Sequence, residues 1–150
     1  MRLEFPLSIS DLPNLIPHSG EMCLWQEVIA FDNEKIHCAT NSHLSPTNPL
    51  KVNGELSSVN LIEYGAQAIA IHGGLLALTK ASDQTSQPTM GYIASLKKIR
   101  FFEFDARTSK LFVDAMQLSA DEAAKLYTFE IIDAENRKVC EGNVLVMHPK

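Results

Sequence analysis

One segment of the sequence, residues 56–78, is apolar almost throughout and predicts a long helix. Ser57 and Ser58 are suitable N-cap residues, because a hydroxyl oxygen can accept a hydrogen bond from an unpaired amide of the first turn. Alanines fill the interior, where they favour the helical conformation. A helix that is apolar on nearly every side has to be buried, so the rest of the chain must cover it.

Three polar side chains interrupt this apolar segment: Glu63, Gln67 and His72. Glu63 and Gln67 are four residues apart and share one face of the helix. A carboxylate in the first turn lies at the positive end of the helix dipole, in a buried setting that suits a general acid or base. The alternative is that Glu63 only helps to cap the helix and Gln67 satisfies buried backbone groups.

The segments around the helix predict an antiparallel sheet. Alternating or apolar runs predict six strands, at residues 22–31, 35–40, 90–104, 111–118, 126–133 and 138–147, with turns at 32–33 and 133–136. Residues 10–16 predict a short helix capped by Ser10, residues 41–55 an irregular stretch and residues 80–89 an exposed loop. Adjacent strands joined by tight turns pair antiparallel. We therefore expect one α+β domain over residues 1–150, with the hotdog architecture of a curved antiparallel sheet around a central helix.

Composition excludes several classes of function. The net charge of −5 and the absence of a basic patch argue against nucleic acid as a partner. The N-terminus has no apolar leader, and the polar residues and glycines of residues 61–78 argue against a membrane span. The cysteines, Cys23, Cys38 and Cys140, are far apart in strand-like contexts and predict reduced core thiols in a cytoplasmic protein. No spacing typical of a metal site is present.

Three short motifs together resemble those of a known family. Residues 17–22 read Pro-His-Ser-Gly-Glu-Met, residues 48–50 read Asn-Pro-Leu, and residues 63–73 begin Glu-Tyr-Gly-Ala-Gln and end His-Gly. They resemble the hotdog-fold 3-hydroxyacyl-(acyl-carrier-protein) dehydratases, and most closely the divergent dehydratases of aryl-polyene biosynthesis. The resemblance extends over most of the chain.

This resemblance implies dehydration of a 3-hydroxyacyl thioester on acyl carrier protein to the trans-2-enoyl thioester, with no cofactor beyond the carrier's phosphopantetheine. A base removes a proton from C2, an acid protonates the departing C3 hydroxyl, and amides at the helix start polarise the thioester carbonyl. It also implies a homodimer whose sites are shared across the interface. A heteromeric complex with another hotdog or a ketosynthase subunit stays open.

The resemblance makes Glu63 a catalytic residue, but the family's usual catalytic histidine is missing. It lies in a Gly-His-Phe-Pro-Gly loop before the helix, and spacing back from Glu63 puts that position near residues 48–50, where there is no histidine. We expect His18 to supply the imidazole, because Pro17 and the following turn hold it in place. His43, in the irregular stretch, is the alternative.

The other predicted site residues bind the substrate: Asn48, Pro49, Ser58, Val59, Gln67 and His43. His72 lies nine residues after Glu63, about 13.5 Å along an ideal helix. That distance is too long for both to act on one pair of substrate carbons, so His72 is expected to serve packing or an interface.

Two other functions fit the same residues. A hotdog thioesterase would hydrolyse the same class of thioester with Glu63 as base or nucleophile. A non-catalytic acyl-binding or partner subunit would keep the fold without the chemistry, and the missing loop histidine favours this reading. The retained Glu63, Gln67 and His18 favour the dehydratase.

Overall fold

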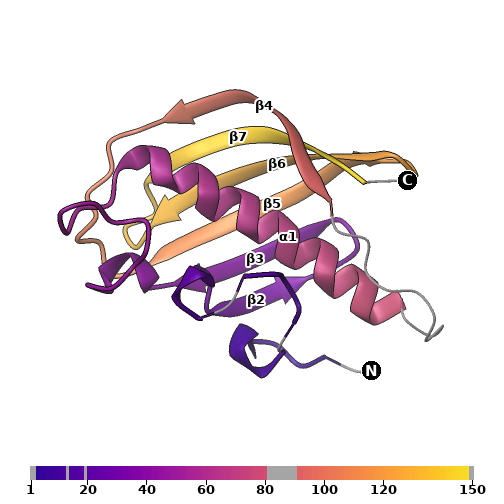
Figure 1. Cartoon of the computed structure of the whole chain (residues 1–150), viewed down its shortest axis with the longest axis horizontal. Coiled ribbons are helices and arrows are strands. Elements are labelled where there is room, and N and C mark those ends of the chain that lie inside the picture. The colour runs from indigo at the N-terminus through magenta and orange to yellow at the C-terminus, as the bar shows by residue number, and fades with distance from the viewer. Residues whose placement is uncertain (1–2, 13, 19, 81–90, 149–150) are drawn as a thin grey trace.

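The computed structural model of the chain describes residues 3–12, 14–18, 20–80 and 91–148. In this part of the chain a long helix, α1 (Leu61–Lys80), lies across one face of a curved seven-stranded antiparallel sheet (Figure 1). The strands are β1 (Leu7–Ser8), β2 (Glu27–Phe31), β3 (Lys35–Thr40), β4 (Tyr92–Phe101), β5 (Leu111–Ala120), β6 (Ala124–Asp133) and β7 (Lys138–Met147). Their order in the sheet is β1-β2-β3-β5-β6-β7-β4. The predicted antiparallel sheet around a central helix is confirmed.

Ser57 caps the helical segment, as the sequence predicts, but α1 itself begins only at Leu61. The Ser57 hydroxyl accepts a hydrogen bond from the Val59 amide at 3.4 Å, and the Asn60 side chain accepts one from the Ser57 amide at 3.0 Å. This reciprocal capping box satisfies amides that have no partner within the helix. A single 3-10 turn, Ser58–Asn60, then leads into α1.

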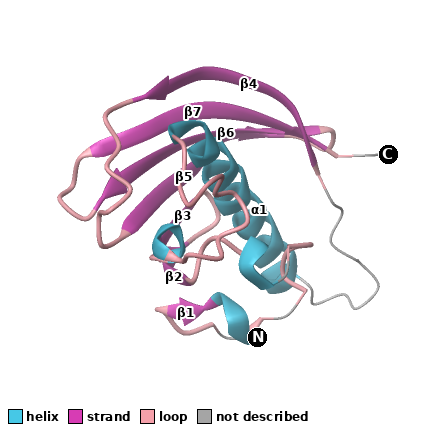
Figure 2. Cartoon of the chain, turned by 60° about the vertical axis from the view of Figure 1, so that its left-hand side comes forward, coloured by secondary structure: helices cyan, strands magenta, loops and turns pink. Residues whose placement is uncertain are grey.

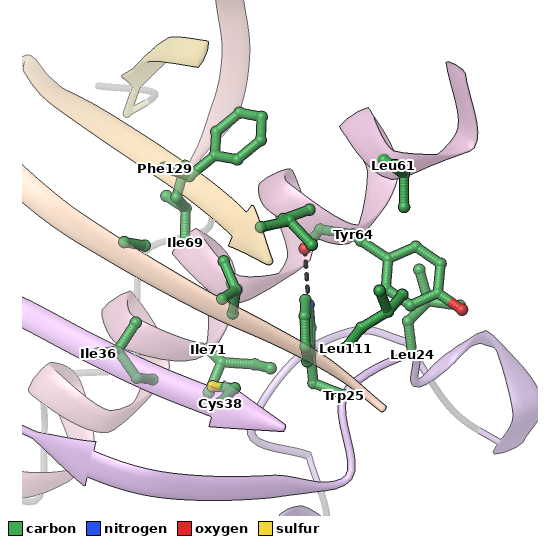
Figure 3. Packing of buried hydrophobic residues seen from close by; sticks show 14 of the residues in the cluster. Leu24, Trp25, Ile36, Cys38, Leu61, Tyr64, Ile69, Ile71, Leu111 and Phe129 are labelled. Carbon is green, nitrogen blue, oxygen red and sulfur yellow. Dashed lines mark hydrogen bonds between the residues drawn. The ribbon is translucent and has the colours of Figure 1, made fainter. Parts of the chain in front are cut away.

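The buried face of α1 and the inner face of the sheet form the core (Figure 3). Trp25 is fully buried, donates its indole N–H to the Tyr64 carbonyl at 2.7 Å and meets the Tyr64 ring edge-on. A Cβ placed on Gly65 would lie 2.5 Å from the Phe129 ring, so glycine lets α1 approach β6 closely. Each large apolar side chain buried here stabilises the fold by about 1.5–3 kcal/mol.

The length and apolarity of Ser58–Thr79 would suffice to cross a membrane. In this protein more than half of the segment is buried inside the domain, against β3, β5, β6 and β7. Packing against the sheet therefore accounts for the apolar sequence of α1.

Several predicted elements have other limits in the structure, and the strand predicted over residues 90–104 is shorter, Tyr92–Phe101. The strand predicted from residue 22 starts only at Glu27, because side chains take the backbone groups that a neighbouring strand would use: Gln67 accepts from the Leu24 amide, and Thr40 donates to the Leu24 carbonyl. The helix predicted over residues 10–16 is one 3-10 turn, Ile9–Asp11, which no side chain caps. Strands β3 and β7 have the predicted limits, and β5 and β6 are each two residues longer.

The irregular stretch of residues 41–55 contains one short 3-10 turn, Ser42–Leu44, as its prolines and glycine lead one to expect. Most of the loop predicted at residues 80–89 lies outside the described residues. The three cysteines are free thiols, with Cys38 and Cys140 buried and Cys23 half-buried.

Candidate active site

A cleft of about 1630 Å³ runs along α1, and its lining also includes residues of β4, β6 and β7. Figure 2 shows the N-terminal segment with β1 below α1, on the side away from β4. The cleft is lined by a stripe of α1 residues spaced three or four apart: Glu63, Ala66, Ala70, Gly73 and Ala77. Apart from Glu63 the side chains of this stripe are small, and α1 also contributes Gln67, Ile69, Gly74 and Leu76 to the lining.

His18 and Glu63 face each other at one end of this cleft. The His18 Nε2 lies 3.8 Å from the Glu63 Oε1, and the two side chains are 27% and 44% exposed. His18 comes from the N-terminal segment, and Glu63 from the first turn of α1. Both groups can therefore reach one molecule in the cleft. The structure shows this proximity, and the catalytic role of each residue stays a prediction.

His43 is held in the protein interior, away from the cleft. Its side chain is 1% exposed, and its Nε2 donates a hydrogen bond to the Thr108 carbonyl at 2.5 Å. Burial lowers the pKa of His43, the hydrogen bond to Thr108 partly offsets this, and the charge of Lys51 lowers the pKa further. His43 is not among the cleft-lining residues, so the structure does not bring it to the cleft that holds His18 and Glu63.

Asn48 organises the irregular stretch through its side chain. Its amide nitrogen donates to the Ser42 carbonyl at 2.9 Å and to the Tyr64 hydroxyl at 3.0 Å, and its oxygen accepts from the Leu50 amide. Asn48 is buried at the cleft wall. These contacts tie the loop to α1 and leave the side chain oxygen engaged by protein.

Three of the predicted substrate-binding residues, Pro49, Ser58 and Val59, are not among the residues that line the cleft. Val59 is exposed, and its amide is already bound by the Ser57 hydroxyl. The structure therefore does not bring the first amides before α1 to the cleft that holds His18 and Glu63.

Gln67 lines the cleft, but its amide group binds the protein backbone. Its oxygen accepts from the Leu24 amide at 2.5 Å and the Trp25 amide at 3.4 Å, and its nitrogen donates to the Met22 carbonyl at 2.7 Å. The contacts of Gln67 therefore match the alternative in which it satisfies buried backbone groups. His72, as expected, is packed inside, between the Tyr127 hydroxyl and the Asp32 carbonyl.

Tyr127 is a cleft residue that the sequence analysis did not select. Its alternation with Phe129 and Ile131 puts these three residues on one face of β6, but nothing in the sequence indicated that this face opens into a cleft. Burial raises the pKa of the Tyr127 hydroxyl, so the phenol remains neutral and can donate a hydrogen bond. In the described part of the chain, no group of His, Cys, Asp and Glu side chains is arranged to hold a metal ion.

Comparison with solved structures shows which fold this is. The chain is similar to a chain of the dehydratase heterocomplex ApeI:P from Xenorhabdus doucetiae, with a TM-score of 0.74, 20% identity, and coverage of 96% of this chain and 92% of that one. It is also similar to a hypothetical thioesterase from Streptococcus pneumoniae TIGR4 solved with coenzyme A (TM-score 0.59, 14% identity, 82% and 84% covered). The PaaI protein of the Escherichia coli phenylacetic acid degradation operon is a third neighbour (TM-score 0.56, 14% identity, 80% of each chain). These likenesses confirm the hotdog fold.

Comparison at the level of sequence families identifies the group. No curated protein matches the chain significantly. Residues 10–150 match the ApeP-like family, described as ApeP dehydratase. This match includes all three motifs, at residues 17–22, 48–50 and 63–73, and it confirms the resemblance that they carry. The chain belongs to the ApeP-like family of hotdog-fold dehydratases, which are hydro-lyases.

Proposed function

We propose that this dehydratase acts on a 3-hydroxyacyl thioester carried by acyl carrier protein and forms the trans-2-enoyl thioester, in aryl-polyene biosynthesis. The observation that carries the proposal is the pair formed by His18 and Glu63, 3.8 Å apart in a long apolar cleft. The reaction is redox-neutral, so it needs no cofactor other than the phosphopantetheine that carries the acyl group.

Dehydration requires one group to take a proton from C2 and a second to deliver a proton to the hydroxyl on the neighbouring C3. In the proposed mechanism the His18 imidazole takes the C2 proton, while the Glu63 carboxyl group delivers a proton to the C3 hydroxyl. The C2–H electron pair forms the double bond, and the C3–O bond breaks with release of water. Two groups within a few ångströms of each other suit a reaction at adjacent carbons. The proton on His18 then returns to Glu63.

The cleft suits a long, extended acyl chain. From Glu63 to Ala77 the α1 wall is about 21 Å long at the rise of an ideal helix, and most of its side chains are alanine or glycine. An acyl chain or the pantetheine arm can lie along the small side chains of this wall, Ala66, Ala70, Gly73 and Ala77. The apolar wall also removes chain atoms from water, which stabilises binding.

We propose that β4 pairs with a second hotdog subunit. β4 is at the edge of the described sheet, beside β7, and it carries several exposed apolar side chains: Tyr92, Ile93, Leu96 and Phe101. An unpaired apolar edge strand is prone to association, and pairing two such edges would cover it. The expected assembly is a homodimer. The ApeI:P dehydratase is a heterocomplex, which makes a related dehydratase subunit the alternative partner.

Intact-mass measurement of a 3-hydroxyacyl carrier protein after incubation with the enzyme tests the reaction. Loss of one water from the acylated carrier supports the proposed dehydration. Release of the free carrier thiol would instead identify a thioesterase, and an unchanged mass at saturating enzyme would contradict both activities for the isolated chain. Sedimentation tests the homodimer, and a monomer at micromolar concentration would overturn it. Adding a second hotdog dehydratase then tests the heteromeric complex.

A further inference from the structure

The segment that carries His18 contacts α1 on both sides of the histidine. We call residues 14–18 and 20–25 the His18 arm. Before the histidine, the backbone of Leu15 packs against Gly74: a Cβ added at Gly74 would lie 2.5 Å from the Leu15 carbonyl oxygen and 3.0 Å from its side chain. Since a main-chain oxygen cannot rotate away as a side chain can, only glycine permits this approach.

After the histidine, Gln67 binds the arm through its side chain. This amide is 1% exposed and bonds the Met22 carbonyl and the Leu24 amide, which lie on either side of Cys23. A neighbouring β-strand would offer the same pairing of one acceptor and one donor. Gln67 therefore replaces a strand at the point where β2 has not yet begun.

The two anchors and the carboxylate share one side of α1. Gln67 follows Glu63 by four residues and Gly74 follows it by eleven, so at 3.6 residues per turn all three lie within about 40° around the helix axis. Glu63 and Gln67 are separated by about 6 Å along this axis. The anchor at Gln67 thus fixes the arm one helical turn from the carboxylate that His18 faces.

We propose that Gln67 and Gly74 are positioning residues, which hold His18 beside Glu63 and do not contact the reacting atoms. The proposal rests on the proposed function of His18 and Glu63. The His18–Glu63 pair has no direct hydrogen bond, since its atoms are 3.8 Å apart. The separation is therefore set by the backbone of the arm. Loss of either anchor allows the arm to shift, and a shift of about 1 Å can lower a rate about 100-fold.

The decisive measurement is independent of turnover. In the otherwise unaltered protein, Glu63→Gln should change the NMR chemical shift of the His18 ring, because the carboxylate lies beside it. Gln67→Met keeps the size of the side chain but removes all three hydrogen bonds, and Gly74→Ala displaces Leu15. In each background we expect the response of the His18 shift to Glu63→Gln to fall by at least half.

Two matched controls are available. Gly73→Ala places a methyl group on the neighbouring helical residue, where no atom lies within 4 Å. Asp133→Asn removes a buried charge at the far β6–β7 turn. Both should retain the full shift response, which separates loss of position from loss of stability.

The kinetic readout is kcat for dehydration, which should fall about 10- to 100-fold in Gln67→Met and Gly74→Ala with little change in KM. A retained shift response in folded Gln67→Met and Gly74→Ala would overturn the proposal. A retained response with a raised KM would show that Gln67 binds substrate. If Gln67→Met does not fold, Gly74→Ala alone decides. The proposed function can fail separately. If Glu63→Gln changes the His18 shift as expected but the wild-type enzyme dehydrates no 3-hydroxyacyl carrier protein, the proposed function is contradicted and the positioning role is still supported.

Discussion

The imidazole Nε2 of His18 lies 3.8 Å from the carboxylate Oε1 of Glu63, although the two residues belong to segments far apart in the chain. Both side chains remain partly exposed to the cleft along α1. A molecule in that cleft can therefore contact an imidazole and a carboxylate at the same time. This relationship makes a dehydration at two adjacent carbons physically reasonable, and the first two predictions follow from it.

Glu63→Gln should lower kcat by about 10²- to 10⁴-fold, the usual contribution of a general acid or base. The amide has nearly the same size, and the side chain is 44% exposed, so the midpoint of urea unfolding should hardly move. Steady-state kinetics with a 3-hydroxyacyl carrier protein, together with urea titration, checks both parts. Near wild-type turnover in the folded variant would remove Glu63 from the mechanism.

His18→Ala should reduce turnover about as much as Glu63→Gln, and the double variant should be little worse, because groups that act as a unit are not additive. His43→Gln should keep most of the rate, since His43 faces Thr108 in the interior. The rates of the four variants are compared at the same fraction of folded protein. An inactive His43→Gln beside an active His18→Ala would reverse the assignment.

His43 should make the free energy of unfolding depend on pH below neutrality. Its ordinary pKa is 6.5, and burial lowers the pKa in the folded protein. Between these two values the unfolded chain binds the proton more readily, so stability is fully present above pH 6.5 and decreases as pH falls through the folded pKa. His43→Gln should flatten this part of the stability curve. Urea unfolding at several pH values from 7.5 to about 4.5 measures it, and an unchanged slope in the variant would contradict the prediction.

Asp133 should stabilise the β6–β7 turn at neutral pH and lose this effect in acid. Burial by itself raises the pKa of Asp133, but hydrogen bonds from the amides of Arg137 and Glu135 and the Arg137 side chain outweigh it and hold the pKa below 3.8. Its stabilisation is therefore present above pH 3.8 and lost as pH falls through the folded pKa. Asp133→Asn should cost on the order of 1 kcal/mol at pH 7. Equal losses at pH 7 and in strong acid would show that charge is not the cause.

Replacing two glycines of α1 by alanine should change the stability of the protein in opposite directions. At Gly65 the new methyl group would lie 2.5 Å from the buried Phe129 ring, whereas at Gly73 no atom lies within 4 Å. Overpacking a core costs about 1–3 kcal/mol, while alanine in place of glycine favours a helix by about 1 kcal/mol. Gly65→Ala should therefore destabilise the protein and Gly73→Ala should stabilise it slightly. Thermal and urea unfolding measure the stability of both variants. A stabilising Gly65→Ala would show that Phe129 moves freely.

The sequence by itself determined the elements whose causes are local. The Ser57 cap, the apolar run that follows it and the strand-forming residues of 138–147 each act within a few residues. The helix and β7 therefore lie within a few residues of where the sequence predicts them. The three motifs also sufficed to indicate the family, because motif residues are read directly from the chain. Side-chain patterns of this kind carry the information about helix, strand and family.

Only the tertiary structure decided what the polar residues contact. Gln67 bonds Met22 and Leu24, and His43 bonds Thr108, all across long stretches of chain. The sequence does not distinguish a glutamine that binds the backbone from one that binds a substrate. The prediction of a strand from residue 22 was wrong for this reason. The physical cause is that a buried polar group must find a hydrogen-bond partner, and folding the whole chain is what supplies that partner.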